Sequence, residues 1–149
     1  MLKLPKGLWI VVADGRKALF LENFSDTMDE DLHVLRKDEL DNPMNRDQGA
    51  GKPGRRAGPG GASGMEHTDW HELAEQDFAG EVAGIVNTWA QVGAVKQVVL
   101  VAPPATLGTL RDKLAPATRK LVLAELPKDL TKHPVAEIAG TVKKTLADL

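Results

Sequence analysis

The sequence lacks cysteine and tyrosine, and it has no long apolar run. Without cysteine the chain has no disulfide framework, no zinc–thiolate site and no cysteine nucleophile. No apolar run approaches the ~18 residues of a membrane-spanning helix, so we expect no membrane insertion. The first residues lack the basic, apolar and small-residue regions of a signal peptide, so we expect a cytoplasmic protein.

The sequence also lacks a large excess of positive or of negative charge. The 149 residues carry 19 Lys and Arg against 21 Asp and Glu, for a formal net charge of −2. This balance excludes a protein that coats nucleic acid over its whole surface. At ~100–200 residues per domain, the length predicts a single domain. A domain of this size buries ~68–70% of its unfolded surface, so its folding requires neither a metal nor a disulfide.

Three segments near the N-terminus predict β-strands. Residues 8–13 are apolar and β-branched, as in a strand that is buried on both faces. Asp14 and Gly15 follow and predict a hairpin turn into a second strand over 17–24, because glycine accepts a positive φ without steric cost. Residues 32–36 predict a third, more exposed strand.

The remainder of the chain predicts alternating helices and strands. We expect a helix from an Asp69 cap to Gly93, a strand over 97–102, a short helix, a strand over 120–126 and a helix from Pro134. The two long helices have apolar stripes made of Phe78, Val82, Ile85, Trp89 and Val92, and of Val135, Ile138, Val142, Leu146 and Leu149. The order βββ–loop–αβαβα is typical of an α/β protein with a mixed five-stranded sheet and helices on both faces.

The segment between the third strand and the first long helix has an unusual composition. Half of the 14 glycines lie in 49–64, and the only charges in 41–65 are Asp41, Asp47 and four cations: Arg46, Lys52, Arg55 and Arg56. Such a segment cannot bury enough apolar surface to offset the entropy of ordering it. We therefore expect one domain, 1–149, with a flexible, basic, glycine-rich loop at about 41–68.

The basic loop is suited to binding phosphates. It precedes a helix N-terminus, where backbone N–H groups favour anions, and Arg55 and Arg56 add positive charge. It has no aromatic residue on which bases could stack, so readout of a base sequence is not expected. It also lacks the Lys-Ser/Thr ending of a nucleotide-binding phosphate loop, so no cofactor is expected. The alternatives are a solvated linker and a segment that orders on a protein partner.

Three residues are candidates for a metal ligand. Asp14 ends the first strand, where an acid can serve a metal-dependent nuclease or hydrolase, but the fourth strand offers no second carboxylate. A turn-forming Asp-Gly pair is the simpler interpretation. His67 and His71 are four residues apart and share one helix face only if the helix includes both of them. With Asp69 as the cap, His67 lies outside the helix, so no metal site is expected.

Three motifs together resemble a known family. They are WIVVADGRKALF at 9–20, APPATLGTLR at 102–111 and KDLT at 128–131, in this order along the chain. They resemble the family of bacterial proteins required for attachment to host cells. That family is in turn similar to the middle domain of archaeal and eukaryotic class I release factors, and the resemblance implies a ribonuclease-H-like sheet.

The resemblance also implies a function for the basic loop. In release factors a basic, glycine-rich loop carries Gly-Gly-Gln before the long helix and promotes ester hydrolysis in the peptidyl-transferase centre. Gly60 and Gly61 match the two glycines, whereas Ala62 replaces the glutamine. The leading hypothesis is a domain with weak or no catalysis that binds the ribosome or structured RNA through Arg46, Lys52, Arg55, Arg56, Gly60 and Gly61. The alternatives are a protein-interaction factor related to host attachment and a metal-dependent nuclease or hydrolase; no catalytic residue is assigned.

Overall fold

The computed structural model describes residues 3–40 and 64–149. Its elements are β1 (Trp9–Ala13), β2 (Lys17–Asn23), β3 (Leu32–Glu39), α3 (Gly64–Gln91), β4 (Val98–Val101), α4 (Pro104–Lys113), α5 (Pro116–Arg119), β5 (Val122–Leu126) and α6 (Val135–Ala147). The strands form one mixed five-stranded sheet in the order β3-β2-β1-β4-β5. This arrangement confirms the predicted fold class.

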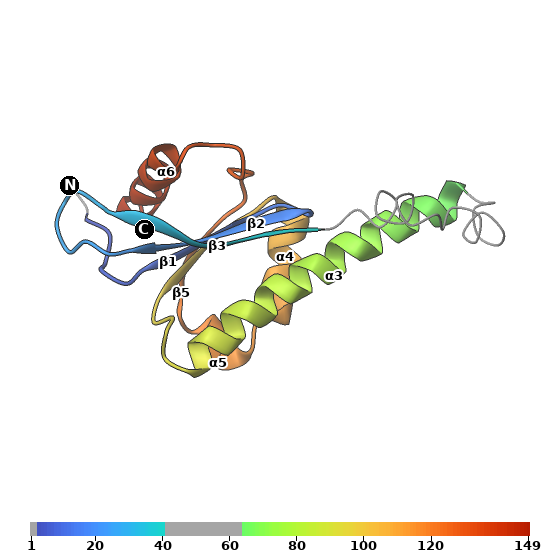
Figure 1. The fold of residues 1–149 in the computed structure, drawn as a ribbon, viewed down its shortest axis with the longest axis horizontal. Helices are drawn as coiled ribbons and strands as arrows, with labels where there is room; N and C mark the ends of the chain where they lie inside the picture. Colours follow the sequence, from blue (N-terminus) through green and yellow to red (C-terminus); the bar gives the residue numbers. More distant parts are fainter. Residues whose placement is uncertain (1–2, 41–63) are drawn as a thin grey trace.

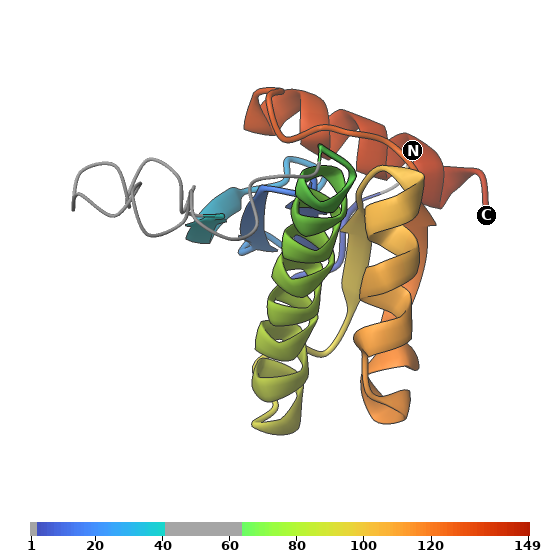
Figure 2. The same ribbon diagram turned by 90° about the vertical axis from the view of Figure 1, so that its right-hand side faces the viewer.

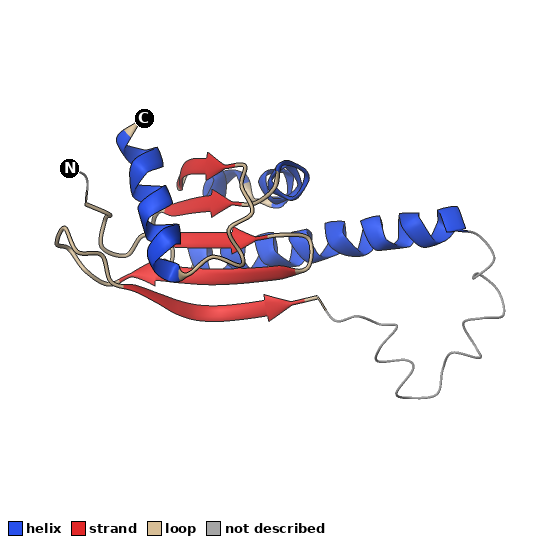
Figure 3. Cartoon of the chain, turned by 90° about the horizontal axis from the view of Figure 1, so that it is seen from above, coloured by secondary structure: helices blue, strands red, loops and turns tan. Residues whose placement is uncertain are grey.

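The strand directions give the sheet two different edges. β1, β4 and β5 are parallel, whereas β2 is antiparallel to both β1 and β3. The carboxyl ends of β1, β4 and β5 therefore meet at one edge, which we call the carboxyl edge, and their amino ends meet at the opposite amino edge (Figure 3). In α/β sheets of this kind ligands commonly bind at the carboxyl edge.

Helices cover both faces of the sheet. Figure 2 shows α3 and α4 side by side on one face and α6 on the other. Trp9 and Val11 of β1 belong to the core beneath α3 and α4, whereas Ile10 and Val12 belong to the core beneath α6. Because successive side chains of a strand point to opposite faces, a strand between two helical layers has to be apolar throughout. This explains the continuous apolar run of β1.

The long helix α3 begins earlier than the sequence predicts. It starts at Gly64, five residues before Asp69, so Asp69 does not cap it and both His67 and His71 lie within the helix. Its 28 residues span about 42 Å, and its N-terminal part projects beyond the sheet (Figures 1 and 3). Within the described ranges no helix combines the length and apolar character needed to cross a membrane.

The apolar stripes of the long helices are confirmed in their middle but not at their ends. Phe78 and Val82 of α3 are buried. Trp89, expected in the core, is partly buried at its margin, and Val92 follows the end of α3 and is 76% exposed. Leu149 follows the end of α6 and is 81% exposed. Residues beyond the last turn have no sheet opposite them, so periodicity alone does not place them in the core.

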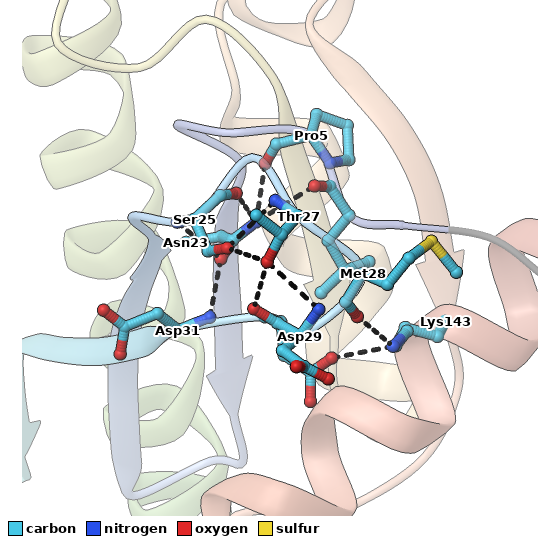
Figure 4. A network of polar contacts seen from close by, with 10 residues as sticks. Pro5, Asn23, Ser25, Thr27, Met28, Asp29, Asp31 and Lys143 are labelled. Carbon is cyan, nitrogen blue, oxygen red and sulfur yellow. Dashed lines mark hydrogen bonds and ion pairs between the residues drawn. The ribbon is translucent and has the colours of Figure 1, made fainter.

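A buried asparagine organises the loop between β2 and β3. The side chain of Asn23 is fully buried, and its amide nitrogen lies 3.0 Å from the carbonyl oxygens of both Leu4 and Pro5. Figure 4 shows this network and its continuation to α6, where Lys143 donates to the Glu30 carboxylate at 2.8 Å. The hydrogen bond from Lys143 lowers the pKa of Glu30. The loop is thereby attached to both the N-terminal segment and α6.

Candidate functional site at the carboxyl edge

Asp14 forms the turn that joins β1 to β2. It directly follows β1 at the carboxyl edge, and its Oδ1 accepts hydrogen bonds from the backbone N–H groups of Arg16 at 2.7 Å and Lys17 at 2.8 Å. The backbone N–H of Asp14 also donates to the Lys17 carbonyl at 2.9 Å. These contacts are those of a turn-forming aspartate.

Thr131 connects this turn to the far end of the chain. Its hydroxyl lies 3.0 Å from Oδ2 of Asp14, which is 117 residues away in sequence, and 2.8 Å from Oδ1 of Asp129. Thr131 is 4% exposed. A hydroxyl has one hydrogen, so Thr131 can donate to only one of the two carboxylates at a time. The sequence did not identify this contact, although Asp129 and Thr131 belong to the KDLT motif that supported the family resemblance.

Gly15 permits a close approach by α3. Gly15 does not have the positive φ that the turn predicted; among the described glycines, positive φ occurs at Gly7 and Gly93. A Cβ atom at Gly15 would instead lie 2.5 Å from Oε1 of Glu75. The residue is small because the Glu75 carboxylate packs against it. The carboxyl edge thus collects Asp14, Glu75 and Asp129 from three different elements.

The described part of this edge does not form a metal site. Among the side chains that the structure describes, those of residues 3–40 and 71–149, no group of three His, Cys, Asp or Glu is arranged to hold a metal ion. Oδ1 of Asp14 already accepts two backbone hydrogen bonds, and Oδ2 lies 3.0 Å from the Thr131 hydroxyl. His71 is exposed on α3, and the side chain of His67 lies outside what the structure describes. The geometry therefore gives no support to a metal-dependent nuclease or hydrolase.

We expect the hydroxyl of Thr131 to contribute to stability. Thr131→Val keeps the shape of the side chain but removes the hydroxyl that lies within hydrogen-bond distance of both Asp14 and Asp129. The loss should be about 1.5–3 kcal/mol of unfolding free energy, the range for hydrogen bonds to charged groups. Thr131→Ser keeps the hydroxyl and is the control. Urea denaturation measures both variants, and equal stability of the Val and Ser variants would contradict the assignment.

The predicted phosphate-binding residues lie outside the described residues. They are Arg46, Lys52, Arg55, Arg56, Gly60 and Gly61, and Ala62 lies there as well. The structure does place the residues that flank this segment, Leu40 and Gly64. β3 ends at Glu39, followed by Leu40, whose N–H donates to the Arg16 carbonyl, and α3 begins at Gly64 on its projecting end (Figure 3). The segment is therefore attached on the carboxyl-edge side of the sheet.

Charge is distributed unevenly between this segment and its neighbours. Residues 41–63 contain four cations and two acids, 4 − 2 = +2, whereas the other residues contain 15 cations and 19 acids, 15 − 19 = −4. Helix α3 alone has six acidic residues and neither Lys nor Arg. In the sequence, the positively charged residues 41–63 are thus followed directly by an acidic helix.

Comparisons with known proteins give a family and a likeness to solved structures. A family model described as "Protein required for attachment to host cells" matches residues 9–142. No curated protein matches the chain. Among solved structures, an archaeal translation termination factor, aRF1, is 14% identical, with a TM-score of 0.48 over 95% of this chain and 41% of that chain. The chain thus spans about two fifths of that factor's length.

Proposed function

The chain belongs to the family of proteins required for attachment to host cells, and from this premise we propose that it is a domain that binds structured RNA, as on the ribosome, through residues 41–63. The observation that carries the proposal is the concentration of cations and glycines in this segment, directly before a long helix. The family match covers most of the chain and includes the segment.

The type of contact follows from the residues present. Lys52, Arg55 and Arg56 can neutralise backbone phosphates, which fix a protein on RNA without reading its sequence. No aromatic residue lies between 41 and 63, so base stacking does not contribute there. The acidic α3 repels phosphates, so the contacts beside its N-terminus have to come from the segment rather than from the helix. The proposed activity is recognition of RNA shape and charge.

Hydrolysis of peptidyl-tRNA is not part of the proposal. By the resemblance to release factors, the residue after Gly60 and Gly61 would position the attacking water through an amide. Ala62 has no polar group in its side chain. The chain is therefore proposed to bind without releasing the peptide.

We expect Arg55→Ala combined with Arg56→Ala to weaken co-sedimentation with ribosomes from the same organism. Removing two phosphate contacts should lower the slope of log affinity against log salt by about 2. Lys128→Ala combined with Lys132→Ala makes the same charge change on exposed residues and is the matched control. Binding that is indifferent to Arg55 and Arg56, or efficient peptide release by the wild type, would contradict the proposal.

A second candidate function, protein interaction, is favoured by one observation. Leu73 lies on the projecting part of α3 and is 58% exposed, next to the exposed acid Glu72. An exposed leucine flanked by acids suits a protein partner with an apolar and basic surface better than it suits RNA. A partner whose capture is lost with Leu73→Ser, and retained with the Arg55 and Arg56 variant, would support this candidate.

A further inference from the structure

Exposed cations gather at the amino edge beside the short helix α5. They are Lys96, Lys113, Arg119 and Lys120, and we call them the α5 basic surface. Lys113 ends α4, Arg119 ends α5 and Lys120 follows it. Lys96 and Lys120 each lie two residues before a strand, and those strands pair in parallel with Val98 beside Val122. Lys96 and Lys120 therefore precede neighbouring strands at the amino edge.

The charges of this surface are not neutralised by carboxylates. Within the described residues none of the four cations forms an ion pair, whereas Arg111 is paired with Glu125 and Lys143 with Glu30. The guanidinium of Arg119 donates to main-chain carbonyls instead, from Nε to Leu114 and from Nη2 to Asp112, both at 3.2 Å. Residues 112–121 contain three of the four cations and one acid, Asp112.

The backbone that carries these cations is held firmly. Asn87 of α3 donates from Nδ2 to the Lys113 carbonyl at 3.1 Å and accepts at Oδ1 from the Ala115 N–H at 2.9 Å. Thr118 is buried, and its carbonyl accepts from the Leu121 N–H. The α4–α5 turn is thus fixed to α3 on one side and to β5 on the other. Positions fixed before binding lower the entropy cost of association.

The C-terminal part of the chain carries more positive charge than α3 does. Residues 92–149, which include the whole α5 basic surface, contain nine cations and five acids, 9 − 5 = +4. Helix α3, in contrast, has six acidic residues and neither Lys nor Arg. A polyanion is therefore attracted to surfaces formed by residues 92–149 rather than to α3.

We propose that the α5 basic surface binds backbone phosphates of RNA, as a contact separate from residues 41–63. This inference rests on the proposed function, from which it takes RNA as the class of partner. Figure 1 shows α5 beside the C-terminal end of α3, whereas residues 41–63 join its N-terminal end. The helix between them spans about 42 Å. An RNA that touches both ends has to be large and structured, because a short single strand reaches only one of them.

The test compares two triple variants in titrations with a duplex RNA hairpin at several salt concentrations. Lys96→Ala, Lys113→Ala and Lys120→Ala remove three cations of the surface and leave Arg119 to hold the turn. The control, Lys128→Ala, Lys132→Ala and Lys144→Ala, makes the same charge change elsewhere on exposed residues. The surface variant should lower the salt slope by about 3 and the affinity at low salt at least ~10-fold. The control should bind as the wild type does.

The possible results separate this inference from the proposed function. Equal loss in both triple variants would show an effect of net charge alone and would overturn the inference. Loss with the Arg55 and Arg56 variant but not with the surface variant would overturn the inference and leave the proposed function standing. Loss with the surface variant alone would support the inference and remove residues 41–63 from the proposed function. No binding of the hairpin by the wild type, or equal binding of polyglutamate, would also overturn the inference.

Discussion

Replacing Trp9 by alanine should lower the free energy of unfolding by about 3–5 kcal/mol, the range for removing a buried aromatic side chain. Trp9 is 1% exposed on the central strand β1, beneath α3. Its ring makes edge-to-face contacts with Phe20 at a centroid distance of 6.3 Å and with Trp89 at 4.8 Å. Alanine would leave a cavity between the sheet and α3 that a close-packed interior cannot fill.

Two further variants show which property of Trp9 matters. Its Nε1 is buried and has no hydrogen-bond partner among the described residues. Trp9→Phe removes this unsatisfied donor along with some volume, so the two effects oppose each other and the net change should stay within about 1 kcal/mol. Trp89→Ala removes a partly buried ring and should cost about 2 kcal/mol. Chemical denaturation followed by circular dichroism measures all three, and a Trp89→Ala variant less stable than Trp9→Ala would contradict this view of the core.

The fold could be predicted from the sequence because its signals are local. The apolar run of β1, the apolar stripe through Phe78 and Val82, and the stripe through Ile138 and Val142 each depend on spacing within one element. These signals were sufficient for the order of the elements and the mixed sheet. The spacing of apolar residues within each segment therefore predicts which segments form helices and which form strands.

The ends of elements could not be predicted in the same way, because they depend on neighbours. β3 continues beyond Arg36 to Glu39 through charged residues, since its backbone pairs with β2 as far as Lys17. Helix α3 continues upstream of Asp69 where its backbone projects away from the sheet. Neither extension is encoded by apolar spacing, so no pattern in the sequence predicts it.

The candidate sites depend on tertiary contacts more than on motifs. The link between Asp14 and Thr131 joins residues that are 117 positions apart. Lys96 and Lys120 precede neighbouring strands because β4 and β5 pair in parallel. A linear sequence shows each of these residues as an isolated polar side chain. What makes them a cluster is the parallel sheet, which brings equivalent strand ends together.

Replacing Asn23 by alanine should cost about 2–4 kcal/mol, because one side chain holds together three segments of backbone. Its Nδ2 lies 3.0 Å from the carbonyl oxygens of Leu4 and Pro5 and 2.9 Å from that of Ser25. Its Oδ1 accepts from the N–H groups of Ser25 at 3.2 Å and Asp31 at 2.9 Å (Figure 4). Alanine would remove all these contacts, and of the carbonyls only that of Pro5 would keep a partner among the described residues, the Leu8 N–H at 3.2 Å.

Asn23→Asp tests whether the donors at this position are what matters. Aspartate has nearly the same shape, but in place of the amide it would direct a charged oxygen toward the carbonyls of Leu4, Pro5 and Ser25. Burial and these carbonyls favour the protonated acid, which raises the pKa of this carboxyl in the folded state above its unfolded value. The penalty is therefore largest at pH above the folded pKa and shrinks as pH falls through it. Denaturation across acid pH should show Asn23→Asp recovering toward the wild type while Asn23→Ala does not. Parallel pH profiles of the two variants would show that shape, rather than hydrogen-bond donation, is what the site requires.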